Sequence, residues 1–268
     1  MNTRHMNKQS GTVLLTTLIA LAYALPALAD MPTAVVEETQ SRSKKGEWGK
    51  ECAVKVQHPT DAADPLAKAV NAYINEALGG SYQGDLFDAK AMVSHYIAEC
   101  LKKPDEDDGD IPADMPPGEE KTEIGKLAET DAYITYEVSA YLFLGGAHGD
   151  NLYDGATFRK SDGRRMGWDA FVKTDEAGFK NLIKKGLKEY WEVKTDAELA
   201  ENLMLENDGG VDAIPLPRAA PLFTKEGVRL TYASYEIAPY AAGMPQFVVP
   251  YAELEPYLTP EAREMVKP

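Results

Sequence analysis

Alternating hydrophobic and polar positions predict β-strands in several parts of the chain. In residues 47–58, Cys52, Val54 and Val56 alternate with charged or amide side chains, and residues 131–144 repeat the same pattern over a longer stretch. A period of two residues is typical of a strand with one buried face. Further strands are predicted after the turn that follows residue 144, ending at Lys160, and in residues 227–237 and 244–249.

Hydrophobic residues at helical spacing predict helices between these strands. Asp64-Pro65 supplies an N-cap and a proline at the first helical position, and Gly79-Gly80 ends that helix. Thr195 and Glu198 have the spacing of a capping box, which begins a helix that should end at Gly209-Gly210. Two more helices are predicted over residues 86–103 and 175–191, and a terminal turn or helix over residues 251–258.

The order of these elements indicates an α+β fold. Strands, helices and strands again, joined by tight hairpins without βαβ repetition, favour a mainly antiparallel sheet with helices packed on one face. We expect an N-terminal strand-helix segment in residues 30–103 and a C-terminal domain in residues 124–268. An acidic, proline-rich loop is expected to join them over residues 104–123, and its spacing of acids does not match a calcium-binding loop.

The first 29 residues have the pattern of a signal peptide. Arg4 and Lys8 precede an uncharged stretch over residues 11–25, and Ala27-Leu28-Ala29 forms a small-x-small cleavage signal. A membrane anchor is the less favoured alternative, because threonines and a proline leave the stretch polar and too short to span a bilayer. We therefore expect residues 1–29 to be cleaved and the protein to be periplasmic or secreted.

Export changes the expected role of the two cysteines. Cys52 and Cys100 are the only cysteines of the 268-residue sequence, and an oxidising compartment allows them to form a disulfide. Cys52 is in register with the apolar positions of its strand, and Cys100 lies on the apolar stripe of its helix. A redox-catalytic role is disfavoured because the two are not in a C-x-x-C arrangement.

Composition and charge exclude several function classes. The apolar share of 44% is ordinary for a globular protein, and the formal net charge is −15. Such acidity disfavours a nucleic-acid binder, which needs a basic face for the phosphates. Loss of the two basic residues in the leader would bring the charge to −17, which favours a basic partner.

One histidine lies in a loop with candidate chemistry. His148 belongs to the sequence Gly145-Gly-Ala-His-Gly-Asp-Asn151, whose glycines permit positive φ and allow Asp150 to approach the ring. In one reading, His148 is a base that Asp150 orients. In the other, the loop, including Asn151, connects two strands and contacts a ligand. The second reading is favoured because no nucleophile motif and no second ligand His is present, so we expect no catalytic residue, metal or cofactor.

A tyrosine-rich segment is the second candidate site. Residues 232–245 contain Tyr235, Glu236, Pro239 and Tyr240 at the end of a predicted strand. Rigid, amphipathic side chains of this kind are common where a protein contacts sugar rings or another protein. The alternative is that these tyrosines cover the core with their hydroxyls in water, and the sequence does not decide between the two.

Together these segments resemble a known family of exported domains. The combination of GGAHG with YEIAPYAAG resembles the RsiV family of anti-sigma factors and certain peptidoglycan deacetylases, over about residues 131–258. The resemblance implies an α+β binding domain at the cell envelope, which in the anti-sigma factors captures lysozyme. We expect neither sigma-factor inhibition nor deacetylation here, because a cleavable leader stands where the anti-sigma factors have a sigma-binding region and a retained membrane helix, and no deacetylase domain is expected after Pro268.

The sequence therefore leaves two functional hypotheses. The favoured one is a soluble, exported envelope-binding protein without catalysis, whose partner is a basic protein of the lysozyme type or cell-wall glycan. The alternative is an envelope hydrolase that uses the loop of His148 and Asp150.

Overall fold

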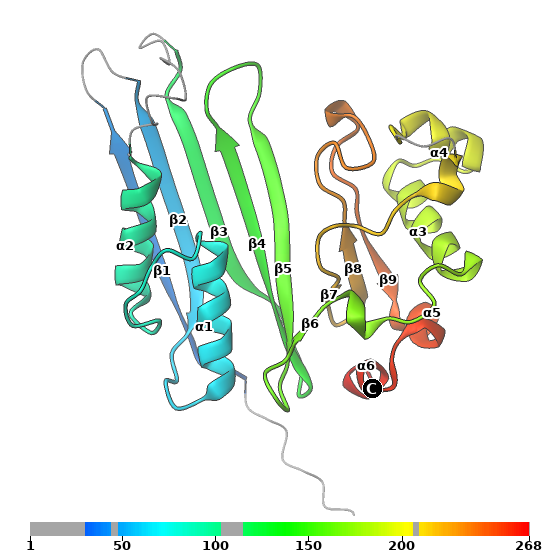
Figure 1. Cartoon of the computed structure of the whole chain (residues 1–268), viewed down its shortest axis with the longest axis horizontal. Helices are drawn as coiled ribbons and strands as arrows, with labels where there is room; N and C mark the ends of the chain where they lie inside the picture. The colour runs from blue at the N-terminus through cyan, green and yellow to red at the C-terminus, as the bar shows by residue number, and fades with distance from the viewer. Residues whose placement is uncertain (1–29, 44–47, 103–114, 206–208, 268) are drawn as a thin grey trace, which may run out of the picture.

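The structure is a computed structural model that describes residues 30–43, 48–102, 115–205 and 209–267. These ranges contain a six-stranded sheet, a three-stranded sheet and six α-helices (Figure 1), which confirms the predicted α+β class. The predicted leader and most of the acidic stretch between α2 and β3 lie outside the described residues. Among those described, we find no helix with the length and apolar content needed to cross a membrane.

The N-terminal part is built on a mixed sheet. Its strands follow the order of the sequence, and all neighbours are antiparallel except β2 and β3, which are parallel. The observed sheet is therefore mainly antiparallel, as the sequence predicts, with one parallel pair. The strands are β1 (Thr33–Arg42), β2 (Lys50–Pro59), β3 (Gly118–Glu129), β4 (Tyr133–Phe143), β5 (Asp150–Arg159) and β6 (Arg165–Met166).

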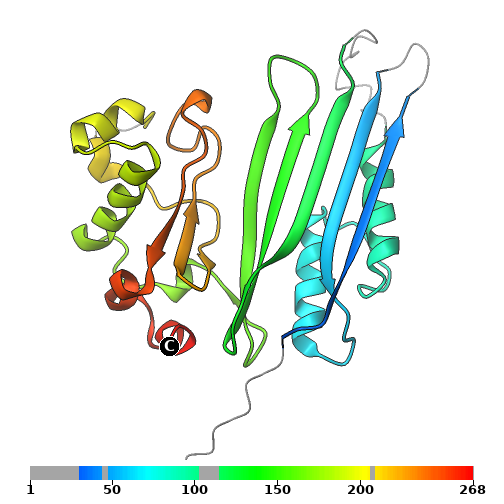
Figure 2. The same ribbon diagram turned by 180° about the vertical axis from the view of Figure 1, so that it is seen from behind.

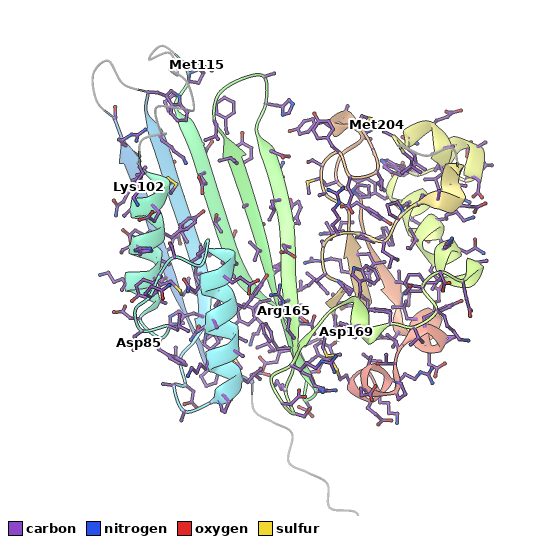
Figure 3. All side chains as sticks on the ribbon, in the orientation of Figure 1. Asp85, Lys102, Met115, Arg165, Asp169 and Met204 are labelled. Atoms are coloured by element: carbon purple, nitrogen blue, oxygen red, sulfur yellow. A yellow bond between two sulfur atoms is a disulfide. The ribbon has the colours of Figure 1, made fainter. Side chains whose placement is uncertain are left out.

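Two helices make the crossover between the parallel strands. α1 (Pro65–Ala77) begins where the Asp64 carboxylate accepts a hydrogen bond from the Leu66 amide, and α2 (Ala89–Cys100) follows. Both pack on one face of the six-stranded sheet (Figure 1) around a core of apolar side chains from the helices and strands β2 to β5. The disulfide between Cys52 and Cys100 joins β2 to α2, with the two Cα atoms 6.4 Å apart (Figure 3).

The C-terminal part has its own sheet and its own core. α3 packs against β9, and a second group of buried apolar residues fills the space between the helices and the smaller sheet. All pairs in this sheet are antiparallel. The elements are α3 (Ala177–Tyr190), α4 (Asp196–Asn202), β7 (Leu222–Phe223), β8 (Gly227–Thr231), β9 (Gln246–Pro250), α5 (Tyr251–Leu254) and α6 (Pro260–Met265), with short 3₁₀ turns η2 (Trp168–Ala170), η3 (Gly210–Ala213), η4 (Tyr240–Ala242) and η5 (Glu255–Tyr257).

The two parts contact each other through β4, β5 and β7. The Thr135 hydroxyl donates to the Phe223 carbonyl at 2.7 Å, and the Phe223 amide donates to the Thr157 hydroxyl at 3.1 Å. Thr135 and Thr157 lie on the side of the sheet opposite α1 and α2, and the smaller sheet lies beside β5 in both ribbon views (Figures 1 and 2). Arg165, labelled in Figure 3, reaches back to α1 and pairs with Glu76 at 3.0 Å.

The structure differs from the sequence-based expectation mainly in the middle of the chain. β3 begins at Gly118, so the end of the expected loop 104–123 is strand, while residues 103–114 lie outside the described part. One face of β3 is open to solvent, so its sequence contains many charged residues. For this reason its first residues resemble a loop in the sequence. The sequence left open whether the N-terminal arm adds a strand, which the structure shows as β1, and it did not predict α6 near the C-terminus.

Candidate binding site

Two loops that are far apart in the sequence meet at one end of the molecule. The His148 ring stacks on the Tyr240 ring, with 3.9 Å between ring centroids and 20° between the planes. Tyr235 lies next to Tyr240, with 5.9 Å between their centroids. We call His148, Tyr235 and Tyr240 the aromatic cluster. The structure thus brings together residues from both candidate segments of the sequence.

The β4–β5 hairpin positions His148. Gly145 and Gly146 have φ values of +92° and +103°, which allows the chain to turn at the end of β4. Gly149 then packs so closely on Tyr141 that a Cβ atom would lie 2.5 Å from the tyrosine ring. The ring of Tyr141 therefore supports the backbone of the loop, a role that the sequence did not reveal.

One backbone oxygen holds the two stacked rings in register. The Gly149 carbonyl accepts a hydrogen bond from the Tyr240 hydroxyl at 2.8 Å and contacts His148 Nδ1 at 2.9 Å. Because a carbonyl only accepts, the proton of this contact belongs to Nδ1, which leaves Nε2 of the neutral ring as an acceptor. The loop and the tyrosine are thus linked by stacking and by hydrogen bonds at the same point.

The second loop is anchored in the C-terminal core. Trp191 at the end of α3 donates from Nε1 to the Ala242 carbonyl at 2.9 Å, and the buried Tyr232 hydroxyl donates to the Pro215 carbonyl at 2.6 Å. Burial raises the pKa of Tyr232 far above its usual range, so that the hydroxyl keeps its proton and remains a donor. These anchors leave the tip of the loop, with Tyr235, to face solvent.

Glu236 stabilises the backbone beside Tyr235. Its two carboxylate oxygens accept hydrogen bonds from the amides of Arg218 and Ala233, at 2.7 and 2.8 Å. Tyr235 is 53% exposed and has a φ of +61°, which is unusual for a residue other than glycine and persists where the surroundings hold it. The structure therefore places Glu236 as a support of the cluster, with both oxygens engaged by the backbone.

The other predicted residues lie around the cluster without forming a catalytic pair. The Asp150 carboxylate accepts from the Asn151 amide at 2.9 Å, and both side chains are exposed at the start of β5. Pro239 is exposed and directly precedes η4. Within the described residues, no three His, Cys, Asp or Glu side chains are grouped so that they could hold a metal ion.

Comparison with known proteins gives a family match to a segment of the C-terminal part. Residues 169–252 match the family described as "Protein of unknown function (DUF3298)". This DUF3298 segment extends from η2 to α5 and contains Tyr235, Glu236, Pro239 and Tyr240, whereas His148 lies before it. One of the three members of the aromatic cluster therefore lies outside the matched segment.

Two solved structures have a similar fold over nearly their whole length. A DUF3298 family protein from Pseudomonas aeruginosa PAO1 is 18% identical with a TM-score of 0.62, covering 87% of this chain and 97% of that one. A member of the DUF3298 family from Bacteroides fragilis NCTC 9343 is 20% identical with a TM-score of 0.63, covering 88% and 98%. At these identities the similarity establishes the fold alone. No curated protein matches the sequence significantly.

Proposed function

We propose that this chain is an exported envelope protein that binds a basic protein of the lysozyme type through the aromatic cluster and catalyses no reaction itself. The observation that carries the proposal is the stack of His148 on Tyr240, which joins loops of the two sheets into one partly exposed aromatic surface. Exposed tyrosines held in place by their loops are typical of protein-binding surfaces, because they bury much area and lose little conformational freedom.

Binding is favoured over hydrolysis by the hydrogen bonds of the candidate acids and bases. His148 Nδ1 is engaged with a backbone carbonyl, and the carboxylates of Asp150 and Glu236 accept from backbone amides. The Nδ1 contact leaves Nε2 as an acceptor, but neither carboxylate bonds to His148, so among the described residues these side chains do not form the acid–base pair that hydrolysis needs. The same side chains are well suited to present a fixed surface.

Charge and resemblance support the choice of partner. The whole sequence has a formal charge of −15, which would increase the rate of encounter with a strongly basic protein. The RsiV-like combination of GGAHG with YEIAPYAAG points to a lysozyme-type protein in particular, and the predicted signal peptide and the disulfide fit an exported protein.

Surface-binding kinetics with a basic lysozyme at low salt would test the proposal. We expect a saturable complex whose dissociation rate rises about tenfold or more in Tyr240→Ala, because a ring that both stacks on His148 and faces the partner is lost. Tyr82→Ala is the matched control, since Tyr82 lies between α1 and α2 with its ring beside His95, and its removal should change little.

Three outcomes would overturn the proposal. The absence of any interaction with a basic lysozyme at low salt would exclude the proposed partner, and an equal effect of Tyr82→Ala would exclude the proposed site. Cleavage or deacetylation of glycan strands by the purified protein, lost in His148→Ala, would establish the hydrolase alternative.

A further inference from the structure

The six-stranded sheet has one face without helices. α1 and α2 cover one face, and the view from behind shows β1 to β4 uncovered by helices on the other (Figure 2). The strand register aligns the side chains of this open face in rows across five strands. One row is Glu37, Lys55, Glu123, Ser139 and Tyr153, and the next is Thr39, Ala53, Lys121, Tyr141 and Asn151.

Side-chain size makes the centre of the open face hollow. Thr39, Ala53 and Ser139 are short, whereas the lysines, glutamates and tyrosines around them are long. The resulting hollow has a volume of about 480 Å³. Sites for small molecules commonly measure about 300 to 1,000 Å³, so the hollow is large enough for a chain of a few sugar units.

Both lysines of the open face are paired with glutamates. Lys55 Nζ lies 2.5 Å from a Glu123 oxygen, and Lys121 pairs with Glu119, two residues away on β3. The hydrogen bond to Glu123 and its charge raise the pKa of Lys55, so the lysine stays charged and the pair intact at neutral pH. The cores of protein–protein interfaces are depleted in charged residues, so this face is better suited to a hydrated, uncharged ligand.

Two tyrosines and an amide line the side of the hollow nearest the aromatic cluster. Tyr153 is 41% exposed on β5, Tyr141 lies beside it on β4, and Asn151 is opposite Tyr141 in the register. Tyrosine rings offer an apolar face to the C–H side of a sugar, and the amide, carboxylates and ammonium groups supply donors and acceptors for its hydroxyls. This mixture matches a hydroxyl-rich ligand more closely than an apolar one.

We propose that the open face is a second binding site, for an uncharged glycan chain that lies in the hollow and stacks on Tyr153 and Tyr141. This goes beyond the proposed capture of a basic protein, because the residues and the ligand are different. The two sites adjoin, since the Tyr141 ring that lines the hollow also supports Gly149 in the loop of the aromatic cluster.

Nuclear magnetic resonance titration of the labelled mature protein with chitotetraose, and separately with cellotetraose, would test the site. We expect saturable shifts with at least one sugar, confined to amides of β2 to β5. The dissociation constant should rise roughly three- to tenfold in Tyr153→Ala through loss of one stacking contact. Tyr190→Ala removes an exposed tyrosine from another surface and should leave the constant unchanged.

The proposal fails if neither sugar causes shifts at about 10 mM, well above the dissociation constants of weak complexes. It also fails if Tyr153→Ala and Tyr190→Ala weaken binding equally, or if the shifts map to the aromatic cluster alone. Lysozyme binding, measured in the same Tyr153→Ala protein, should be unchanged. A failure of the glycan site is thereby distinguished from a failure of the proposed function.

Discussion

At the scale of single residues, a buried carboxylate joins three parts of the N-terminal region. The Glu129 side chain is 4% exposed and accepts from the Met31 amide at 2.8 Å, while Lys126 and Lys160 pair with its oxygens. Burial opposes ionisation, but the hydrogen bonds from the two lysines outweigh it and lower the pKa of Glu129. The carboxylate thereby holds the short segment around Met31, which lies between the predicted leader and β1.

Replacing this carboxylate should destabilise the protein in a pH-dependent way. Glu129→Gln leaves the buried Lys160 without its partner, and we expect the free energy of unfolding to fall by about 3 kcal/mol at neutral pH. Because the folded pKa is below the unfolded value of about 4.3, the stabilisation by Glu129 is present above that pH and is lost as the pH falls through the folded pKa.

Urea unfolding of the unchanged protein and of Glu129→Gln, between neutral and acidic pH, would measure the difference in their free energies of unfolding. Glu123→Gln is the control, because Glu123 forms an exposed pair with Lys55 and should contribute less than about 1 kcal/mol. A loss in Glu129→Gln that is as small as in the control, or that persists unchanged at low pH, would contradict the assignment.

At the scale of elements, the β4–β5 hairpin positions the aromatic cluster through a close backbone contact. Gly149→Ala would place a Cβ atom 2.5 Å from the Tyr141 ring and displace the carbonyl that holds His148 and Tyr240. We expect about 1 to 3 kcal/mol of destabilisation together with altered chemical shifts of the His148 ring. Unchanged shifts would show that the loop tolerates a side chain here.

A second substitution, Tyr141→Ala, removes the ring that the new Cβ atom at position 149 would contact. In the double variant Gly149→Ala with Tyr141→Ala, the space freed by the ring accommodates the new methyl group. We expect the cost of Gly149→Ala to be clearly smaller in that background, as a double-mutant cycle would show. An additive effect of the two changes would contradict the proposed contact.

The cap of α4 is the clearest local signal among the helices. The Thr195 hydroxyl accepts from the Glu198 amide at 3.1 Å, and the Glu198 carboxylate accepts from the Thr195 amide at 2.9 Å. Thr195→Ala should lower the free energy of unfolding by about 1 kcal/mol, measured as a lower Tm. Glu201→Ala, an exposed change within the same helix, should alter it by less than about 0.5 kcal/mol.

At the scale of the whole molecule, the disulfide restricts a large loop of the unfolded chain. Cys52 and Cys100 are 48 residues apart, and their Cα separation of 6.4 Å falls within the range of natural disulfides. In the chain-entropy model, closing a loop of this length stabilises the native state by about 4 kcal/mol. The bridge holds α2 on the sheet at β2, next to the parallel pair.

Reduction of the disulfide should therefore lower the stability of the protein by about 4 kcal/mol, measured by urea unfolding with and without reductant. The double variant Cys52→Ala with Cys100→Ala should show a similar loss and no further effect of reductant. Thiol titration of unreduced, denatured protein that finds two free thiols would contradict the prediction.

Much of the secondary structure is determined by short stretches of sequence. The cap at Asp64, the capping box at Thr195 and the two-residue alternation of β2 and β4 act over a few neighbouring residues, and the structure confirms each of them. With only two cysteines, the disulfide partners were also fixed once an oxidising compartment was inferred. Such signals need no knowledge of distant parts of the chain.

The tertiary structure alone decided how these elements form surfaces. The Tyr240 hydroxyl bonds to a carbonyl 91 residues away, and nothing in either loop specifies the other as its partner. Likewise, the charged sequence of β3 forms a strand because β2 and β4 provide backbone hydrogen bonds on both sides. The sequence thus determined the local elements through short-range hydrogen bonding and hydrophobic period, while the aromatic cluster and the open face depend on packing between distant segments.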